Sequence, residues 1–372
     1  MLAIIFVISA FTLIHIYIFW RAGSVSLLRQ HVSRKIIVGS GVVLWTLFLF
    51  YLSRLYGYGG TSKLAAMFEI CALDWIVTLL LSFVLLLAID VVTGFGFLLP
   101  RLASKLRGLG LAFVAVLSLV AIVQGMRPPE VQNYEVSLSG LPDELDGTVL
   151  VAVADMHIGS LIGKRWLEAR VAQVRAEQPD LVVLLGDIIE WSGTPPYWDM
   201  IPVLRSLSAP LGVWAVLGDH ESYGRQDTSV AVFDAAGFQT LRNSWAEVKP
   251  GLVLAGVDNL STDNFNGQGD NPISRALMDC PPGATVFLSH KPWQADKVAS
   301  GEAGLMLCGH THGGQIWPLG YLFRNRFPFF DGRYEVDGMT LIVCRGAGTF
   351  GPRMRLWRPG EILRITLHRE KF

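Results

Sequence analysis

The hydrophobic pattern divides the chain into two parts near residue 126. Long apolar runs dominate the first part, whereas short apolar runs alternate with polar segments in the second. A helix that spans a bilayer needs roughly 20 mostly apolar residues. Four runs come close to this length, at about residues 2–20, 36–53, 75–92 and 108–126. We therefore expect a transmembrane region with four helices in residues 1–127 and a separate domain in residues 128–372.

Charges in the predicted loops indicate an orientation. The loops after the first and third runs carry basic residues and no acidic ones: Arg21, Arg29, Arg34, Lys35, Arg101, Lys105 and Arg107. The intervening loop mixes both signs: Arg54, Lys63, Glu69 and Asp74. Basic loops stay on the cytoplasmic side, so we expect both termini, and the second domain with them, to be extracytoplasmic. The first run has no preceding basic segment and no cleavage site, which favours a retained anchor over a signal peptide.

Three ionisable residues lie near or within the predicted spans, namely His15, Asp74 and Asp90. An ionisable group inside a membrane can mark a transport path. Because these three fall near the ends of the spans, we interpret them as interfacial residues instead.

Short elements follow one another regularly in the second domain. Pro128 and Pro129 end the fourth helix because proline has no backbone donor, and residues 134–138 alternate like a half-buried strand. Continuous apolar runs predict buried strands at residues 149–154, 181–185, 213–217, 252–257, 285–288 and 305–308. Residues 166–177 have helical spacing, with a buried side predicted at Trp166, Ala169, Val171 and Val174. This order predicts an α/β domain, in which ligands bind beyond the carboxyl ends of the strands.

Residue types that bind metals cluster directly after these strands, and five of the eight histidines lie there. The patches read Asp155-Met156-His157, Gly186-Asp187, Gly218-Asp219-His220-Glu221, Ser289-His290 and Gly309-His310-Thr311-His312. Each patch alone is ordinary, because an aspartate after a strand is also a common turn or helix-cap residue. Together they predict a site for two divalent cations, and such sites are suited to the hydrolysis of phosphate esters.

Composition narrows the class of partner. The formal net charge of +0 at pH 7 argues against a general nucleic-acid binder, so no nucleic acid is expected as a partner. The four cysteines, Cys71, Cys280, Cys308 and Cys344, form neither a CxxC pair nor a disulfide framework. We expect all four to be buried small hydrophobic residues.

The patches also resemble those of a known family. The segments DMH, GDIIE, GDHE, SH and GHTHGGQ are similar, in this order, to the motif series of the calcineurin-like metallophosphoesterases, from about Tyr134 onward. Within that family the chain looks like a bacterial membrane-anchored phosphodiesterase subgroup, distantly similar to UDP-diacylglucosamine pyrophosphohydrolase. The resemblance implies two central mixed β-sheets flanked by helices, and a location in the bacterial inner (plasma) membrane.

The resemblance further implies a role for each residue. The first metal ion would be held by Asp155, His157 and His312, the second by Asp219, His290 and His310, and Asp187 would bridge the two. Manganese, iron, zinc or nickel suits such imidazole and carboxylate ligands. His220 would face the substrate and protonate the leaving group, and Glu190 matches the position that orients this histidine. The alternatives are a turn residue for His220 and a surface acid for Glu190.

One residue departs from the family pattern, because Asp219 stands where asparagine is usual. A carboxylate can bind metal, but it lacks the NH2 donor of the amide and adds negative charge that faces an anionic substrate. Near the C-terminal glycine loop, Arg345, Arg353 and Arg355 are either phosphate contacts or, more commonly, solvated charges.

These observations favour a membrane-anchored phosphoesterase with two divalent metal ions. It would hydrolyse a phosphodiester, a pyrophosphate or a phosphomonoester, with a lipid-linked or envelope phosphate as the candidate substrate and the lipid bilayer as its partner. Two alternatives stay open. One is a catalytically weak sensor that binds metal and phosphate, which Asp219 motivates, and the other is a membrane interaction module.

Overall fold

The computed structural model describes residues 2–55, 62–159, 161–190, 197–222, 226–258 and 271–370. The chain divides into two compact units. The helical unit comprises Met1–Met126 and the short segment Gly351–Met354. The α/β unit comprises Arg127–Phe350 and Arg355–Phe372.

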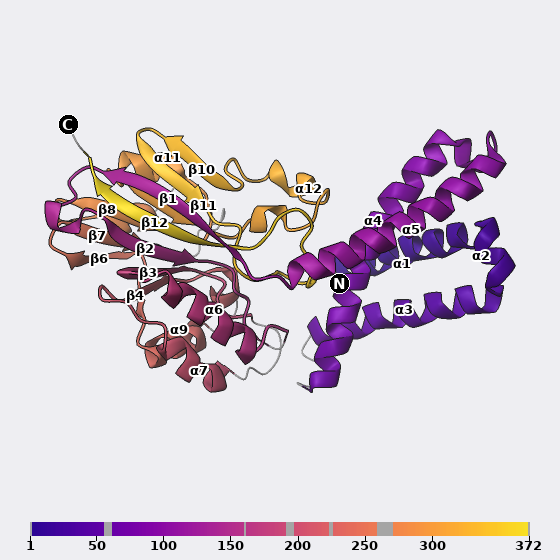
Figure 1. The fold of residues 1–372 in the computed structure, drawn as a ribbon, viewed down its shortest axis with the longest axis horizontal. Coiled ribbons are helices and arrows are strands. Elements are labelled where there is room, and N and C mark those ends of the chain that lie inside the picture. The colour runs from indigo at the N-terminus through magenta and orange to yellow at the C-terminus, as the bar shows by residue number, and fades with distance from the viewer. Residues whose placement is uncertain are drawn as a thin grey trace. The chain divides into compact units, whose positions relative to one another are not determined.

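The helical unit contains α1 (Leu2–Ala22), α2 (Ser26–His31), α3 (Arg34–Leu55), α4 (Lys63–Val92) and α5 (Pro100–Gly125) (Figure 1). All of these except α2 are long and apolar enough to cross a membrane, as the sequence predicts. Two of them begin earlier than expected. Helix α4 starts at Lys63 because the Ser62 side chain caps it by accepting a hydrogen bond from the backbone N–H of Ala65. Helix α5 starts at Pro100, a residue that suits the first turn of a helix.

The earlier start of α4 corrects the predicted loop, since Glu69 and Asp74 both lie inside this helix. Asp90, by contrast, lies near the end of α4, as expected. Its side chain is fully buried within the helical unit. Its carboxylate pairs with Arg21 Nε and with Arg107 Nη2, each at 2.6 Å, and accepts a hydrogen bond from the Tyr17 hydroxyl at 2.6 Å. Three helices thus meet around one neutralised carboxylate.

Two six-stranded sheets form the centre of the α/β unit (Figure 1). The first sheet has the order β1-β12-β2-β3-β4-β5 and the second the order β10-β11-β9-β8-β7-β6. The strands are β1 (Glu130–Leu138), β2 (Thr148–Val153), β3 (Leu181–Leu185), β4 (Val213–Val216), β5 (Gln239–Thr240), β6 (Ser244–Lys249), β7 (Leu252–Gly256), β8 (Ala284–Leu288), β9 (Leu305–Cys308), β10 (Gly332–Val336), β11 (Met339–Val343) and β12 (Glu361–Arg369).

Both sheets are mixed, which confirms the expected fold class. In the first sheet β12 runs antiparallel to β2, while β2, β3, β4 and β5 are parallel. In the second sheet the outer pairs β10–β11 and β6–β7 are antiparallel, and the strands between them are parallel. The six predicted apolar strands are present within one residue of their expected ends.

The described part of the α/β unit also contains seven α-helices. They are α6 (Lys164–Ala176), α7 (Tyr197–Arg205), α8 (Asp219–Ser222), α9 (Gln226–Ala236), α10 (Pro272–Leu277), α11 (Ala295–Ser300) and α12 (Tyr321–Arg324). Along β3, Leu181, Val183 and Leu185 pack in the cluster between the sheets. The alternate residues Val182 and Leu184 pack on the other side against helices, because successive side chains of a strand point to opposite faces.

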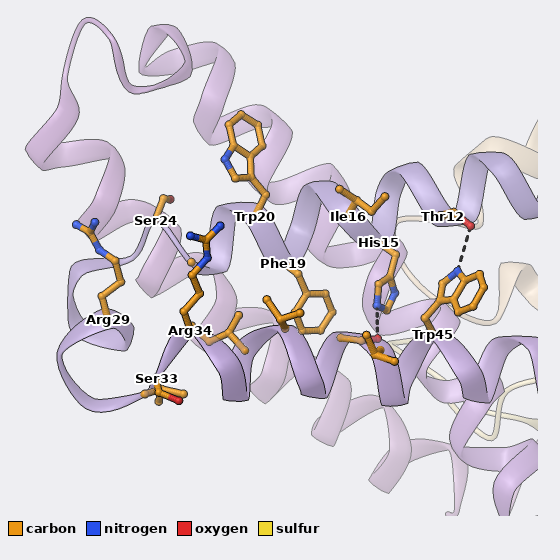
Figure 2. Close-up of a pocket in the computed structure, with 16 residues that line it drawn as sticks. Thr12, His15, Ile16, Phe19, Trp20, Ser24, Arg29, Ser33, Arg34 and Trp45 are labelled. Carbon is orange, nitrogen blue, oxygen red and sulfur yellow. Dashed lines mark hydrogen bonds between the residues drawn. The ribbon is translucent and has the colours of Figure 1, made fainter.

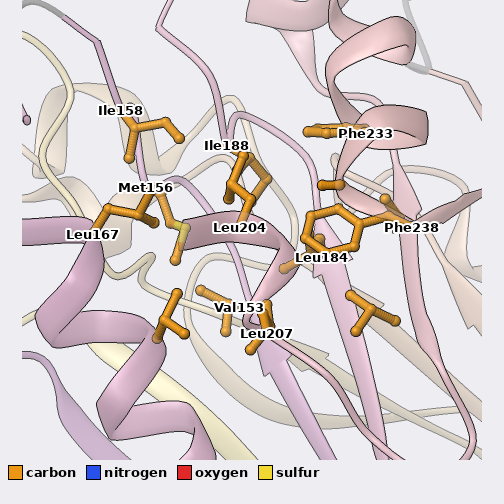
Figure 3. Packing of buried hydrophobic residues seen from close by; sticks show 14 of the residues in the cluster. Val153, Met156, Ile158, Leu167, Leu184, Ile188, Leu204, Leu207, Phe233 and Phe238 are labelled. Carbon is orange, nitrogen blue, oxygen red and sulfur yellow. The ribbon is translucent and has the colours of Figure 1, made fainter. Parts of the chain in front are cut away.

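Figure 3 shows the helix-facing cluster, in which Val153 and Leu184 lie among side chains of α6, α7 and α9. The buried face of α6 differs in part from the expected one. Val171 and Val174 are buried as predicted, but Leu167 and Arg170 join them, whereas Ala169 is exposed and Trp166 only partly buried. The cysteines also differ from expectation, since Cys308 and Cys344 are buried but Cys71 is exposed.

Candidate metal centre

The predicted ligands follow strands that are neighbours in their sheets. Asp155 comes after β2, Asp187 after β3 and Asp219 after β4, and these three strands are adjacent and parallel. His290 and His310 come after β8 and β9, which are adjacent and parallel in the second sheet. Because parallel strands end at the same edge of a sheet, their loops meet there. The structure brings all seven predicted ligands, with His220, into overlapping groups of potential metal ligands.

The first group consists of Asp155, His157 and His312, whose ligand atoms all lie within 4.8 Å of one another. His312 Nε2 lies 3.2 Å from His157 Nε2 and 3.5 Å from Asp155 Oδ1. All three residues are buried. Burial lowers the pKa of His312 well below its usual value, so its imidazole is neutral, which is the form that binds metal.

The second group consists of Asp187, Asp219, His290 and His310. His310 Nδ1 lies 3.2 Å from His290 Nε2 and 3.1 Å from Asp219 Oδ2. The other ring nitrogen of His290, Nδ1, lies 2.9 Å from the Leu185 carbonyl oxygen. A carbonyl oxygen can only accept a hydrogen bond, so Nδ1 carries a proton, and Nε2 is the nitrogen that faces the ligand group.

Asp187 belongs to the second group and also lies close to His157 of the first. Its Oδ2 is 3.2 Å from His290 Nε2 and 3.9 Å from His157 Nε2, and its Oδ1 accepts a hydrogen bond from the His220 backbone N–H at 2.8 Å. Burial alone would raise the pKa of Asp187, but His290, His157 and His220 lower it well below its usual value. A Cβ atom at residue 218 would collide with this carboxylate, which explains the glycine there.

Strained backbone conformations are concentrated among these residues. Five of the seven candidate ligands have a positive φ in the left-handed region: Asp155 (52°), His157 (48°), Asp187 (51°), His310 (74°) and His312 (51°). Such conformations cost about 1–3 kcal/mol each and persist only where the surroundings hold them. Here the backbone N–H of His310 donates to the Asp155 carboxylate, and that of His157 to the Asp187 carbonyl oxygen. The fold thus holds these side chains in position at the expense of backbone strain.

Glu190 connects two histidines of the centre. Its Oε1 is 2.8 Å from His220 Nδ1 and its Oε2 is 2.9 Å from His157 Nδ1. Burial alone would lower the pKa of His220, but the hydrogen bond and charge of Glu190 raise it to about 9. Burial would likewise raise the pKa of Glu190, but the two histidines lower it to about 2. Because Glu190 contacts Nδ1 of His220, the other ring nitrogen, Nε2, is the one that faces the centre, 4.0 Å from Asp187 Oδ2. The surface-acid alternative for Glu190 is wrong, because this carboxylate is largely buried between two rings.

Sequence reasoning missed the part that Glu221 plays. This buried carboxylate accepts hydrogen bonds from the backbone N–H groups of Asp187, Ile189 and Gly218, each at 2.8 Å. It therefore ties the loop after β3 to the loop after β4, and both loops carry candidate ligands. The GDHE segment contains this residue, but its partners are backbone groups that only the fold brings near it.

Two further residues near the centre were interpreted incorrectly or overlooked. Arg355 is neither a solvated charge nor a phosphate contact, since it is 2% exposed. It donates hydrogen bonds to the carbonyl oxygens of Arg345, Gly346 and Gly348, and so holds the C-terminal loop. Lys291 was overlooked. Its Nζ lies 2.7 Å from Asp219 Oδ1.

The donor atoms suit divalent transition-metal ions. Neutral imidazole nitrogens and carboxylate oxygens are common ligands of manganese, iron and zinc, and none of the donors in the groups described is a thiolate. Ring nitrogens face each other in two places, His157 with His312 and His290 with His310. Such facing nitrogens are stable when a proton or a cation lies between them. The residues present therefore fit a pair of metal ions.

Comparison with known proteins identifies the class. The calcineurin-like phosphoesterase family matches residues 148–314. An uncharacterized metallophosphoesterase from Aquifex aeolicus is 32% identical over 241 residues, covering 64% of this chain and 91% of that protein. The chain therefore belongs to the calcineurin-like phosphoesterase family.

Other relatives extend the comparison. A "transmembrane protein with metallophosphoesterase domain" from Danio rerio is 32% identical over 279 residues, covering 70% of this chain. The alignment spans 62% of that relative's own length. Relatives thus come from animals as well as bacteria, so the similarity reaches beyond a bacterial subgroup. Among solved structures, a dimetal phosphatase from Danio rerio matches with 15% identity and a TM-score of 0.34, covering 54% of this chain and 88% of that one.

Proposed function

We propose that this protein is a membrane-anchored phosphoesterase that uses two metal ions to hydrolyse a phosphodiester, a pyrophosphate or a phosphomonoester. Residues 1–127 would form the membrane region and residues 128–372 the catalytic domain. The observation that carries the proposal is the position of Asp187, whose carboxylate lies within reach of histidines from both groups of ligands. A shared carboxylate is what a site for two adjacent cations requires.

The residues would divide the work as follows. Asp155, His157 and His312 would hold one ion, Asp219, His290 and His310 the other, and Asp187 both. Bound ions would neutralise the phosphoryl oxygens and lower the pKa of a coordinated water. Glu190 lies on Nδ1 of His220, and Nε2 would deliver a proton to the leaving oxygen. Glu190 would fix the ring orientation of His157 as well as that of His220.

The substrate class and location are part of the same proposal. Four helices suited to a membrane would keep the catalytic domain beside the bilayer, so a lipid-linked or envelope phosphate is the substrate we favour. Because basic loops stay in the cytoplasm, the catalytic domain would lie on the opposite side of the membrane. A reporter that is active only outside the cytoplasm, fused after Phe372, should be active; activity of a cytoplasm-only reporter at that position would reverse the orientation.

The enzymatic proposal is tested with the full-length protein in detergent, stripped of metal by a chelator. Chromogenic phosphodiester and phosphomonoester substrates are then supplied with Mn²⁺, Zn²⁺ or Mg²⁺. We expect turnover only with added metal and a loss on the order of 10³-fold in Asp187→Asn. Asp227→Asn, an exposed aspartate on α9, is the matched control. Two bound equivalents of metal without turnover on any ester would favour the sensor alternative.

A further inference from the structure

Lys291 and Asp219 form an ion pair at the edge of the candidate metal centre. Lys291 Nζ lies 2.7 Å from Asp219 Oδ1, and the two side chains are only 8% and 10% exposed. The other carboxylate oxygen, Oδ2, lies 3.1 Å from His310 Nδ1, inside the second group of ligands. One aspartate thus presents one oxygen to the ligand group and the other to a buried ammonium.

The lysine is held in this position by several contacts. Its carbonyl oxygen accepts hydrogen bonds from the Ser289 hydroxyl at 2.9 Å and from the Cys308 thiol at 3.5 Å. Its ammonium lies 4.9 Å from the ring centroid of Trp293, a cation–π distance. Burying an ammonium is costly unless it is paired, so this arrangement depends on the Asp219 carboxylate.

The pair has an electrostatic consequence for the centre. Three carboxylates, those of Asp155, Asp187 and Asp219, belong to the ligand groups. Each one strengthens the attraction for cations but repels an incoming phosphate anion. The Lys291 ammonium cancels the charge of one of them at short range, and it pins the carboxylate so that Oδ2 faces His310.

We propose that Lys291 is a positioning residue of the metal centre, which makes Asp219 act as a neutral, fixed oxygen ligand and so allows an anionic phosphate to bind beside it. The proposal rests on the proposed function and explains how the site accommodates an aspartate at position 219. Lys291 acts on the centre only through Asp219, so the effects of substituting the two residues should not be additive.

The test is a double-mutant cycle on the full-length protein, made of wild type, Lys291→Met, Asp219→Asn and the double variant. Mn²⁺ affinity, the affinity of the Mn²⁺-loaded protein for inorganic phosphate, and the midpoint of thermal unfolding are measured. Lys291→Met should bind Mn²⁺ at least as tightly as wild type, because the centre becomes more negative, but bind phosphate about tenfold more weakly. Asp219→Asn should weaken Mn²⁺ binding about tenfold and lower the unfolding midpoint, because it leaves a buried ammonium unpaired.

The double variant should recover phosphate binding and stability to within about threefold of wild type, since it removes both charges together. Lys297→Met, an exposed lysine on α11, should behave as wild type. If Lys291 had only a structural role, Lys291→Met would weaken Mn²⁺ and phosphate binding together, and that result would overturn the proposal. A double variant that binds phosphate more weakly, or unfolds at a lower temperature, than either single variant would also overturn it. Failure of the wild type to bind Mn²⁺ would overturn the proposed function and this role with it.

An independent observation concerns the helical unit, where a cavity of about 1000 Å³ lies between α1 and α3. Figure 2 shows Arg29, Arg34, Ser24 and Ser33 at one end, with Phe19 and Ile16 farther along α1. The opposite end is closed by a hydrogen bond from Trp45 Nε1 to Thr12 Oγ1 at 3.1 Å and by a contact between His15 Nε2 and the Gly41 carbonyl at 2.9 Å. The cavity is therefore basic at one end and apolar along its length.

A cavity that is basic at one end and apolar along its length is complementary to a phospholipid. Residues 21–35 contain no acidic side chain, and in the described part of the chain neither Arg29 nor Arg34 makes an ion pair. Planar guanidinium groups are well suited to phosphate oxygens. The apolar side chains beyond them, such as Ile16 and Val38, are more than half exposed, and at membrane depth such surface is covered by acyl chains or by another helix.

We infer that this cavity binds one phospholipid with an anionic headgroup, whose phosphate lies against Arg29 and Arg34. The purified full-length protein is reconstituted in nanodiscs with phosphatidylglycerol or phosphatidylcholine, and retained lipid is counted by native mass spectrometry after release. We expect the wild type to retain phosphatidylglycerol in about tenfold preference to phosphatidylcholine. The variant Arg29→Gln/Arg34→Gln should lose this preference. The control Arg101→Gln/Lys105→Gln, which changes two exposed basic residues on α5, should keep it.

A bulky substitution in the apolar part of the cavity tests whether lipid is retained by the cavity itself or only by the positive surface charge. Val42→Trp, at an exposed residue that lines the cavity, should reduce retention of lipid although both arginines remain. Unchanged preference in Arg29→Gln/Arg34→Gln, or unchanged retention in Val42→Trp, would overturn the inference. So would a dimer whose cross-links map to α1 and α3, because a second copy would then cover the cavity.

Discussion

The two units bury charge in opposite ways. In the helical unit, Asp90 is paired with Arg21 and Arg107 and accepts the Tyr17 hydroxyl, so that this cluster is complete within the chain. In the α/β unit, carboxylates surround ring nitrogens that face each other at 3.2 Å in two places. That cluster offers its carboxylate oxygens and ring nitrogens to a shared proton or to cations.

The contrast separates a charge cluster that stabilises the fold from one that is organised around a ligand. A self-contained cluster should respond to mutation through stability and should be indifferent to metal. A cluster of ligands should respond through metal binding and turnover, and its stability should depend on the metal supplied. The following predictions test that distinction, from the largest expected effect to the smallest.

The largest effect is expected at His220, the one histidine of the centre to which we assign no metal. His220→Asn should lower kcat on the chromogenic phosphodiester by about 10²–10⁴-fold, because the proton donor to the leaving group is lost. The Mn²⁺ content, measured by elemental analysis, should stay at the wild-type value. Loss of one equivalent of metal would instead make His220 a ligand.

In the helical unit the sensitive residue is Asp90. Asp90→Ala leaves two buried arginines facing each other and should cost about 3–5 kcal/mol of stability, measured by unfolding in detergent. The triple variant Arg21→Met/Asp90→Leu/Arg107→Met removes all three charges and should be close to wild type. A loss of less than about 1 kcal/mol of stability in Asp90→Ala is what a water-exposed ion pair would give. That result would contradict the contrast drawn between the two charge clusters.

Metal supply should stabilise only one of the two units. At a free Mn²⁺ concentration about 100 times the dissociation constant, each occupied site adds about 2.7 kcal/mol to the free energy of unfolding of the α/β unit. Hydrogen exchange measured by mass spectrometry should slow in the segments after β2 and β3 and remain unchanged in α1 and α4. Equal slowing in both units would mean that the helical cluster also depends on metal.

The smallest effect is expected at Glu190, which contacts two histidines without belonging to the ligand groups. Glu190→Gln keeps the shape but removes the negative charge, and should lower metal affinity or turnover by about 10–100-fold. Glu302→Gln, at an exposed glutamate, is the control. A variant with wild-type kinetics and metal affinity would show that the contacts of Glu190 serve packing alone.

Much of the α/β unit follows from local sequence patterns. Strands such as β3 and β9 have the predicted boundaries, because a continuous apolar run between turns specifies a strand buried on both faces. The positions of the candidate ligands were predictable for the same reason, since each lies within four residues of the end of such a run. The four long apolar helices were also predictable, because their length and composition alone meet the requirement of a bilayer.

The sequence by itself therefore determined which residues end each strand and what chemistry they carry. Only the tertiary structure decided what neutralises and supports them. The C-terminal strand β12 inserts between β1 and β2, Glu221 accepts three backbone N–H groups from the loops after β3 and β4, and Lys291 pairs with Asp219, 72 residues earlier. Strand order, buried ion pairs and hydrogen bonds to distant backbone groups depend on contacts between segments far apart in the chain, and no local pattern records them.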